Sequence, residues 1–317
     1  MITMLYPLSI AFPIALAAVG TGIGQGLIAI KSFEGVSRQP HASTEINKIA
    51  LLGMMLTETS AILGLVISIF LLVDTTTPLS YEFASLARLG IGCAIGLTSL
   101  IAGITSSFPA QAACMSVARQ PFFSSKILQL MLITQTVIMT PNIFGFLIAL
   151  LIHAQVPTID NYGQGLQLLA AGICIGLGSI GPCIGLSSFA YAACTAIGIN
   201  RKSYTKIMPF TFICEGIIET PVIFALLISL LILNTHIRPE QATIQGIALI
   251  SAAFCMSLST IGTGISAGKV GASACLQIGN NPDHYSMISK IGLLGLAMID
   301  TFAIYGFIVS IILIYAI

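Results

Sequence analysis

The sequence predicts an all-α transmembrane protein made of four tandem helical hairpins, with eight spans. The first observation is composition: 56% of the 317 residues are hydrophobic and only 7% are charged, whereas a soluble domain carries about 25% charged residues. The second is an internal repeat, because the acidic residues Glu58, Glu219 and Asp300 are spaced by two repeat lengths and then by one. The third is that each acid lies inside a strongly apolar stretch. The net charge of +1 gives no indication of a nucleic-acid partner.

Eight apolar segments are long enough for the roughly 20 helical residues that cross a bilayer. They pair in chain order into hairpins over residues 1–78, 79–159, 160–239 and 240–317, which leaves no room for a soluble domain. The first segment has no basic residue before Lys31, so we expect a retained span rather than a signal peptide. The expected spans are 7–31, 49–73, 86–117, 127–152, 166–198, 207–233, 243–276 and 288–316.

Each hairpin loop leads into its second helix in one register. Pro40 precedes Glu58 by about five helical turns. The identical interval separates Pro121 from Met139, Arg201 from Glu219, and Pro282 from Asp300. A threonine follows each of the four positions, at Thr59, Thr140, Thr220 and Thr301. Unrelated helices would not share this register, so the repeat covers whole hairpins, which are joined by linkers 74–82, 153–162 and 234–241.

Basic residues gather at one end of the predicted hairpins. Of the 12 Lys and Arg residues, only Arg88 and Arg238 lie away from the loops that join the two helices of a hairpin. Basic residues favour the cytoplasmic side of a membrane. We therefore expect an integral, multi-pass membrane protein with cytoplasmic hairpin loops and with both termini outside.

The first helix of each hairpin carries small residues at alternate positions, as in Gly20, Gly22, Gly24 and Gly26. Residues two apart lie on nearly opposite flanks of a helix, and small residues let helices approach closely. Each such helix is therefore expected to have a close neighbour on both flanks, as in a ring, although a compact bundle would also use small residues. The counterparts are Gly103, Thr105 and Ser107; Gly181, Cys183, Gly185 and Ser187; and Gly262, Gly264, Ser266 and Gly268.

The eight cysteines lie in or beside apolar segments, and none forms a Cys-x-x-Cys pair. This distribution is typical of small packing residues. We expect neither a disulfide framework nor a metal site.

The first hairpin resembles the c subunit, or proteolipid, of F-type ATP synthases. The resemblance rests on Gly22-Ile-Gly-Gln-Gly26, on Arg38-Gln-Pro40 and on a mid-membrane acid, Glu58, which follows the proline at the interval described above. Asp300-Thr-Phe-Ala-Ile-Tyr305-Gly is similar to the second-helix signature of that family. The pattern extends over nearly the whole chain four times, whereas usual family members hold one hairpin.

The resemblance implies a component of a rotor ring in an ATP-synthase-bearing membrane, such as the bacterial inner membrane. Four hairpins would form an arc of its two layers, beside other copies of the chain. Glu58, Glu219 and Asp300 would each carry an ion through lipid in neutral form and release it at an arginine of the stator, the a subunit. Burial favours the neutral form of a carboxyl group, which agrees with that role. No cofactor is implied beyond the transported proton or sodium ion.

In the second hairpin Met139 stands at the carrier position, where its thioether can bind no proton. That hairpin is therefore expected to be a silent spacer. The resemblance also implies that the hairpin loops dock the central-stalk subunits. The docking residues would be Arg38, Gln39, Pro40, Arg119, Gln120 and Pro121.

Accessory roles follow from the same resemblance. Gln25 matches an inner-helix glutamine that bonds the carboxyl group, and Tyr305 matches a tyrosine near the site. The hydroxyls of Thr59, Thr220 and Thr301 complete the expected accessory set. Glu215, four residues before Glu219, is expected to be either an accessory proton group or a polar residue near the cytoplasmic or ring-interior surface.

Several alternatives stay open. Gln25 and Thr59 are compatible with sodium, but the glutamine is missing from the other hairpins, so we expect protons. A V-type or archaeal-type proteolipid would explain fused hairpins and a lost carboxyl, whereas the Arg-Gln-Pro loops favour the F-type. An eight-span secondary transporter is a more distant alternative, because such proteins are also built from repeats. No metal-ligand cluster or His-Ser pairing indicates a membrane-embedded hydrolase.

Overall fold

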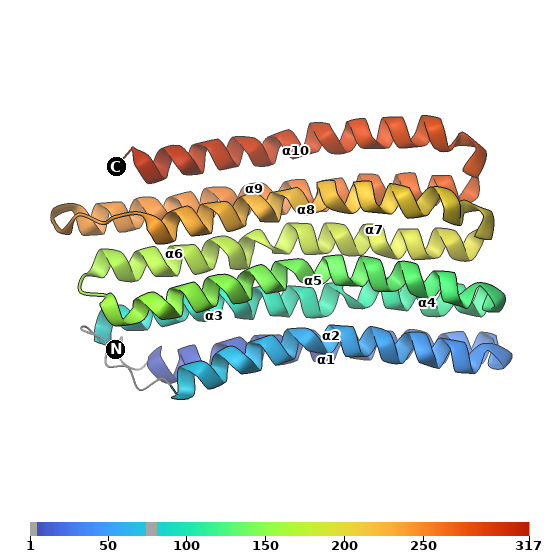
Figure 1. The fold of residues 1–317 in the computed structure, drawn as a ribbon, viewed down its shortest axis with the longest axis horizontal. Coiled ribbons are helices and arrows are strands. Elements are labelled where there is room, and N and C mark those ends of the chain that lie inside the picture. Colours follow the sequence, from blue (N-terminus) through green and yellow to red (C-terminus); the bar gives the residue numbers. More distant parts are fainter. Residues whose placement is uncertain (1–4, 74–80, 317) are drawn as a thin grey trace.

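The computed structural model describes residues 5–73 and 81–316, and all regular structure in these residues is helical (Figure 1). The predicted linker 74–82 lies almost entirely outside the described residues. Eight of the described helical stretches are long and apolar enough to cross a membrane. The α-helices are α1 (Leu5–Arg38), α2 (Ser43–Val73), α3 (Tyr81–Thr105), α4 (Ser107–Arg119), α5 (Ser124–Gln155), α6 (Tyr162–Gly178), α7 (Ile180–Ile199), α8 (Tyr204–Asn234), α9 (Ala242–Asn280) and α10 (Tyr285–Tyr315).

Two of the predicted spans each consist of two consecutive α-helices. Span 86–117 is divided into α3 and α4 at Ser106, and span 166–198 into α6 and α7 at Ser179. Proline has no N–H and clashes with the carbonyl four residues earlier. Pro109 and Pro182 act on the carbonyls of the last residues of α3 and α6, which accounts for both breaks. In each case the chain continues in nearly the same direction (Figure 1).

The helices form two layers whose members follow chain order. The inner layer contains α1, then α3 with α4, then α6 with α7, then α9, and each packs on the next. The outer layer contains α2, α5, α8 and α10, which also contact one another in sequence. Each of α2, α5 and α8 packs on its own inner helix and on the inner helix of the following hairpin, whereas α10 has only α9 beneath it. The last hairpin therefore lacks the inner neighbour that the first three have.

All four hairpin turns lie at one end of the helices, and the two ends of the described chain lie at the other (Figure 1). Each turn is a single 3₁₀ turn in the predicted register. The 3₁₀ turns are Pro40–Ala42, Pro121–Phe123, Arg201–Ser203 and Pro282–His284. Proline at the first position of three of them fits the fixed backbone angle that this position needs. The third turn has no proline at its first position. There the side chain of Asn200, the preceding residue, accepts a hydrogen bond from the Lys202 N–H at 3.0 Å.

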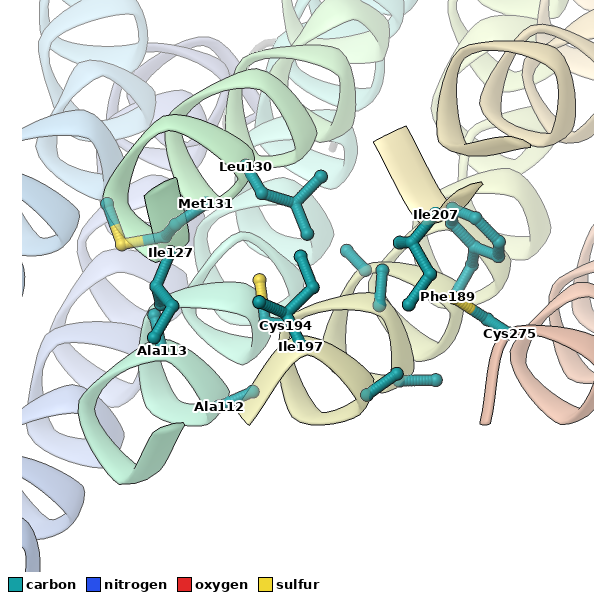
Figure 2. Packing of buried hydrophobic residues seen from close by; sticks show 14 of the residues in the cluster. Ala112, Ala113, Ile127, Leu130, Met131, Phe189, Cys194, Ile197, Ile207 and Cys275 are labelled. Carbon is teal, nitrogen blue, oxygen red and sulfur yellow. The ribbon is translucent and has the colours of Figure 1, made fainter. Parts of the chain in front are cut away.

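Two apolar clusters fill the chain, one toward the hairpin turns and one toward the termini. Figure 2 shows part of the cluster near the turns, where Leu130 of α5 lies toward Cys194 of α7 and Phe189 packs near Ile207 of α8. The second cluster is centred on α3, α6 and the far halves of α5, α8 and α9. The predicted carrier positions fall between these two clusters.

Glycines set the spacing of the inner helices. A Cβ atom on Gly24 of α1 would collide with the backbone of Gly103 in α3, and a Cβ atom on Gly185 of α7 would collide with the backbone of Gly264 in α9. These pairs are the small residues that the sequence placed on helix flanks. Close backbone approach through small residues is the usual way for helices to associate in lipid.

Candidate functional site

The four predicted carrier positions lie at one depth. Glu58, Met139, Glu219 and Asp300 each occupy the same position counted from the first residue of their outer helix, α2, α5, α8 and α10. At 1.5 Å rise per residue this places all four roughly 22 Å along the helix from the hairpin turns. The outer helices of all four hairpins therefore hold the carrier position at the same depth. Groups that pass a stationary partner one after another must share such a depth.

Two carrier positions, Met139 and Glu219, face the preceding outer helix. The Ser60 hydroxyl of α2 donates to the Met139 sulfur at 3.7 Å. The Thr140 side chain of α5 lies beside the Glu219 carboxyl group of α8. Glu58 is exposed, whereas Glu219 and Asp300 are partly buried, because α2 has no preceding outer helix within the chain. A second copy placed before α2 would supply the missing side of the Glu58 site.

Thr140 is a functional candidate that sequence reasoning did not single out. The residue belongs to the second hairpin, which is predicted to be silent, yet its side chain borders the carboxyl group of the next hairpin. The only signal in the sequence was the threonine after each carrier position. The repeat alone did not indicate that this threonine serves the following hairpin rather than its own.

The predicted accessory threonines do not reach the carboxyl groups of their own hairpins. Thr59 donates to the Leu56 carbonyl at 2.7 Å, and Thr301 donates to the Met298 carbonyl at 2.7 Å. Thr220 donates to the Gly216 carbonyl at 3.0 Å. A hydroxyl bonded to its own helix can still accept a hydrogen bond from a neighbour, so their accessory role stays a prediction.

The two other accessory candidates, Gln25 and Tyr305, form their described contacts with groups other than the carrier carboxyls. The Gln25 amide donates to the Met54 carbonyl at 3.3 Å, one helical turn from Glu58 on the same outer helix. Tyr305 is exposed, and its ring packs edge-on against Phe302 with ring centroids 6.0 Å apart. Gln25 therefore joins the two helices of the first hairpin near the carrier, and Tyr305 lies on the outward surface.

The silent position is enclosed and apolar. Met139 is 7% exposed and packs with Ala102 of α3 and Cys183 of α7. One turn before it, the Gln135 amide donates to the Gly53 carbonyl of α2 at 2.7 Å and to the Thr57 hydroxyl at 3.2 Å.

Just beyond the silent position, a second amide joins the two layers. The Asn142 amide oxygen accepts from Ser99 of α3 at 2.7 Å and from Thr98 at 3.3 Å. Amides thus tie α5 to α2 before Met139 and to α3 after it, and neither amide can take up or release a proton near neutral pH.

Glu215 is buried in the interior of the chain, which disagrees with one of its two expected placements, near the cytoplasmic or ring-interior surface, and leaves the other, an accessory proton group, open. Its i to i+4 spacing from Glu219 correctly placed both acids on one helix face. That spacing did not reveal which neighbouring helices cover the face, and α5, α7 and α9 all pack against α8.

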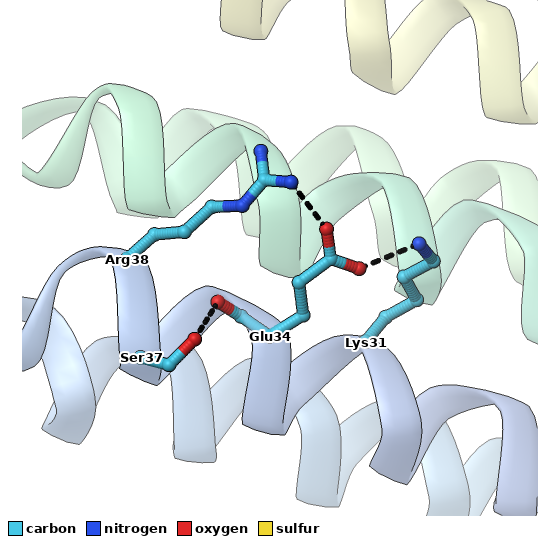
Figure 3. Close-up of polar contacts among 4 residues, drawn as sticks. All are labelled: Lys31, Glu34, Ser37 and Arg38. Carbon is cyan, nitrogen blue, oxygen red and sulfur yellow. Dashed lines mark hydrogen bonds and ion pairs between the residues drawn. The ribbon is translucent and has the colours of Figure 1, made fainter.

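The hairpin turns carry the predicted docking residues on one surface. Arg38 and Lys31 both pair with Glu34, at 2.5 Å and 2.6 Å, as Figure 3 shows. In the second turn the Gln120 amide donates to the Gly198 carbonyl of α7 at 2.9 Å.

The second and third turns share a groove. It is lined by Arg119, the fully exposed Phe122 and Arg201, among other residues. The groove combines positive charge with exposed aromatic surface, and arginine and aromatic residues are enriched at protein interfaces.

The two ends of the inner layer present complementary unfilled flanks. A Cβ atom on Gly22 or Gly26 of α1, or on Gly262 of α9, would meet nothing within 4 Å. Within the chain the corresponding positions are filled by the next inner helix, as at Gly24 and Gly103. The free flank of α9 therefore matches the flank of α1 that a second copy would offer.

A family model described as the ATP synthase C subunit matches the chain four times, over residues 8–71, 89–152, 169–232 and 250–313. The K subunit of the A-type ATP synthase of Methanocaldococcus jannaschii is 30% identical over 233 residues, which cover 72% of this chain and 95% of that protein.

Single-hairpin relatives match shorter stretches. The ATP synthase c subunit of Clostridium botulinum is 48% identical over 58 residues, 18% of this chain and 73% of that protein. The ATP synthase c subunit of Gloeobacter violaceus is 47% identical over 62 residues, 20% of this chain and 76% of that protein.

Proposed function

This chain belongs to the ATP synthase C-subunit family, and we propose that it is an ion-translocating, non-catalytic rotor component of a rotary ATP synthase. The observation that carries the proposal is the placement of three acids and one methionine at a single depth on successive outer helices. A membrane-embedded carboxyl group is costly and is usually functional. Three such groups on one circular path suit a rotor that presents each of them in turn to a stationary partner.

The proposed cycle uses protonation to control charge. A neutral carboxyl group can pass through lipid, because burial disfavours only its charged form. At the stator, a fixed arginine favours the ionised form, so Glu58, Glu219 and Asp300 release their protons there and take up new ones on leaving. In this cycle Thr140 supplies a hydroxyl beside the Glu219 carboxyl group.

The relatives support the archaeal-type alternative better than the F-type interpretation. The K subunit of M. jannaschii matches over 72% of this chain, a stretch longer than two hairpins, whereas the c-subunit relatives match about one hairpin. The Arg-Gln-Pro loops that favoured the F-type occur only at Arg38 and Arg119. We therefore assign the chain to a fused rotor of the A-type kind, with its hairpin turns on the cytoplasmic side against the central stalk.

Protons are the proposed cargo. A sodium ion needs several oxygen ligands in a fixed arrangement. The amide of Gln25 is engaged with the Met54 carbonyl, and Ser106, Leu186 and Ala267 replace it in the other hairpins. A proton needs only the carboxyl group, which all three carrier sites possess.

Copies of the chain close into a ring. The free flank of α9 at Gly262 receives the free flank of α1 at Gly22 and Gly26, and α10 gains the inner neighbour that it lacks. Head-to-tail contacts of this kind generate closed rings, here of about three or four chains. Each chain contributes three carriers per four hairpins, so fewer ions pass per turn, and a turn needs a larger driving force per ion. Such a ring suits a proton pump or a synthase that works at high proton-motive force.

Reconstituted complex tests the proposed activity. ATP hydrolysis in proteoliposomes should acidify the lumen at the same rate with and without sodium, as measured with a pH-sensitive dye. Acidification that requires sodium would overturn the choice of ion. A preparation that stays monomeric by native mass spectrometry in mild detergent would contradict the rotor itself and favour a self-contained transporter.

Ring closure has its own matched test. Gly22→Leu and Gly262→Leu should each abolish the ring, because the added side chain fills a flank that the next copy must occupy. Gly216→Leu is the control: that glycine also has nothing near its Cβ position, but it lies on the outer helix α8. Intact rings in all three variants would rule out the proposed closure.

A further inference from the structure

Glu215 of α8 is the one acidic side chain that is buried in the described part of the chain, with 2% of its surface exposed. Neither carboxyl oxygen has a hydrogen-bond partner among the described residues. The described ion pairs involve only Glu34 with Lys31 and Arg38, at the hairpin turns. A buried charge without a cation or a donor is strongly unfavourable, so this group must be neutral or must gain a partner.

The groups that face Glu215 offer no positive charge. On its own helix these are Cys214 and Glu219; Cys194 faces it from α7, and Cys275 faces it from α9. No titratable group of α5 or α10 interacts with it in the described residues. Thiols do not compensate a carboxylate charge. Glu219 makes ionisation of Glu215 still less favourable, because two carboxylates one turn apart cannot readily both be charged.

The repeat indicates what Glu215 does at this position. Its counterpart in the second hairpin is Gln135, whose amide donates across the outer layer to the Gly53 carbonyl of α2 at 2.7 Å. By the repeat register, the counterpart of that acceptor for Glu215 is the carbonyl of Thr134 in α5, and Cys194 of α7 interacts with both residues. A protonated carboxyl group can donate one hydrogen bond as the amide does, whereas a carboxylate can only accept.

We propose that Glu215 is a second proton-binding site of the third hairpin, which keeps its proton during ion transport and uses it to donate a hydrogen bond to the backbone of α5. Glu219, one turn away and partly exposed, exchanges its own proton with the stator path. The two acids of this hairpin therefore have different roles. The proton of Glu219 is transported, whereas the proton of Glu215 forms a hydrogen bond between α8 and α5. Each chain then binds four protons but transports three. Only the role of Glu219 in this proposal rests on the proposed rotor function.

Infrared spectroscopy of the purified ring tests this assignment. The carbonyl band of a protonated carboxylic acid, shifted by deuterium exchange, should correspond to one group per chain at an alkaline pH that ionises the other carboxyl groups. The band should vanish in Glu215→Gln, which places at this position the residue that hairpin two carries naturally. Gln135→Glu should add a second such group, because the Gly53 carbonyl and the Thr57 hydroxyl can accept a hydrogen bond from the protonated acid. If the band at that pH is identical in wild type and Glu215→Gln, the proposal is wrong.

Stability provides a second readout that a merely space-filling residue would not change. At acidic pH the wild-type and Glu215→Gln rings should dissociate at the same temperature, because both have a donor. At strongly alkaline pH the Gln variant should withstand higher temperature, since only the wild type can lose its donor. Parallel pH profiles would contradict the proposal. Neither measurement involves ion transport, so failure here is distinguishable from failure of the rotor function.

Discussion

Hairpins two and three share one backbone register, yet their outer helices carry chemically different side chains at equivalent positions. In α5 the carrier position is Met139, with the bonded amides of Gln135 before it and Asn142 after it. In α8 the same three positions hold Glu215, Glu219 and Val222. Amides keep their hydrogen bonds at any physiological pH, whereas carboxyl groups donate only while protonated. In the proposed function, the difference between a spacer hairpin and an ion-exchange hairpin therefore lies in side-chain chemistry on the same backbone register.

The largest effect is expected from changing the spacing of silent positions around the ring. Glu58→Gln or Glu219→Gln would each create a silent position directly beside Met139, so that two silent positions become neighbours. Asp300→Asn would instead leave every silent position between two carriers. All three variants keep two carriers per chain, so they serve as controls for one another.

Proton pumping by Asp300→Asn should exceed that of the other two variants on the order of tenfold, which corresponds to about 1.4 kcal/mol of added barrier for crossing the longer gap. The initial rate of dye quenching in proteoliposomes measures this. Equal rates in the three variants would show that rotation is indifferent to gap length.

The next effect concerns the silent position itself. Met139→Glu should raise the ratio of ions to ATP by about one third, because four carriers replace three on each chain and the Ser60 hydroxyl already faces the site. Met139→Gln is the neutral control of similar size. The ratio follows from the proton-motive force at which net ATP turnover stops. An unchanged ratio in an assembled, working Met139→Glu ring would mean that the second hairpin is silent for reasons beyond its missing acid.

The smallest effect concerns the bonds that hold the spacer. Gln135→Ala and Asn142→Ala each remove an interhelical hydrogen bond and should destabilise the ring by roughly 0.5–1.5 kcal/mol, the range for such bonds in membranes. Thermal dissociation in detergent, followed on gels, compares both with wild type. Thr136→Ala is the control, because Thr136 is exposed and bonds only within α5. A loss for the control as large as for the amides would argue against the spacer account.

Sequence reasoning predicted the features that depend on period and register. The four hairpins, the common depth of the carrier positions and the place of Met139 among them all follow from one interval. It could not predict features that depend on which helix covers which face. Thr140 borders the carboxyl group of the following hairpin, and Glu215 is buried, because each of the first three outer helices packs over two consecutive inner helices. The break before Pro109 required weighing one proline against a long apolar run.

The central claim is that each chain presents three exchangeable carboxyl groups and one silent position. A carbodiimide that attacks protonated, accessible carboxyl groups in lipid tests it most directly, with intact mass and peptide mapping of the purified ring as the readout. The account predicts three adducts per chain at saturation, at Glu58, Glu219 and Asp300, with the enclosed Glu215 unmodified and with labelling that slows as pH rises. Absence of adducts at all three residues, or modification of Glu215 in place of Glu219, would contradict it.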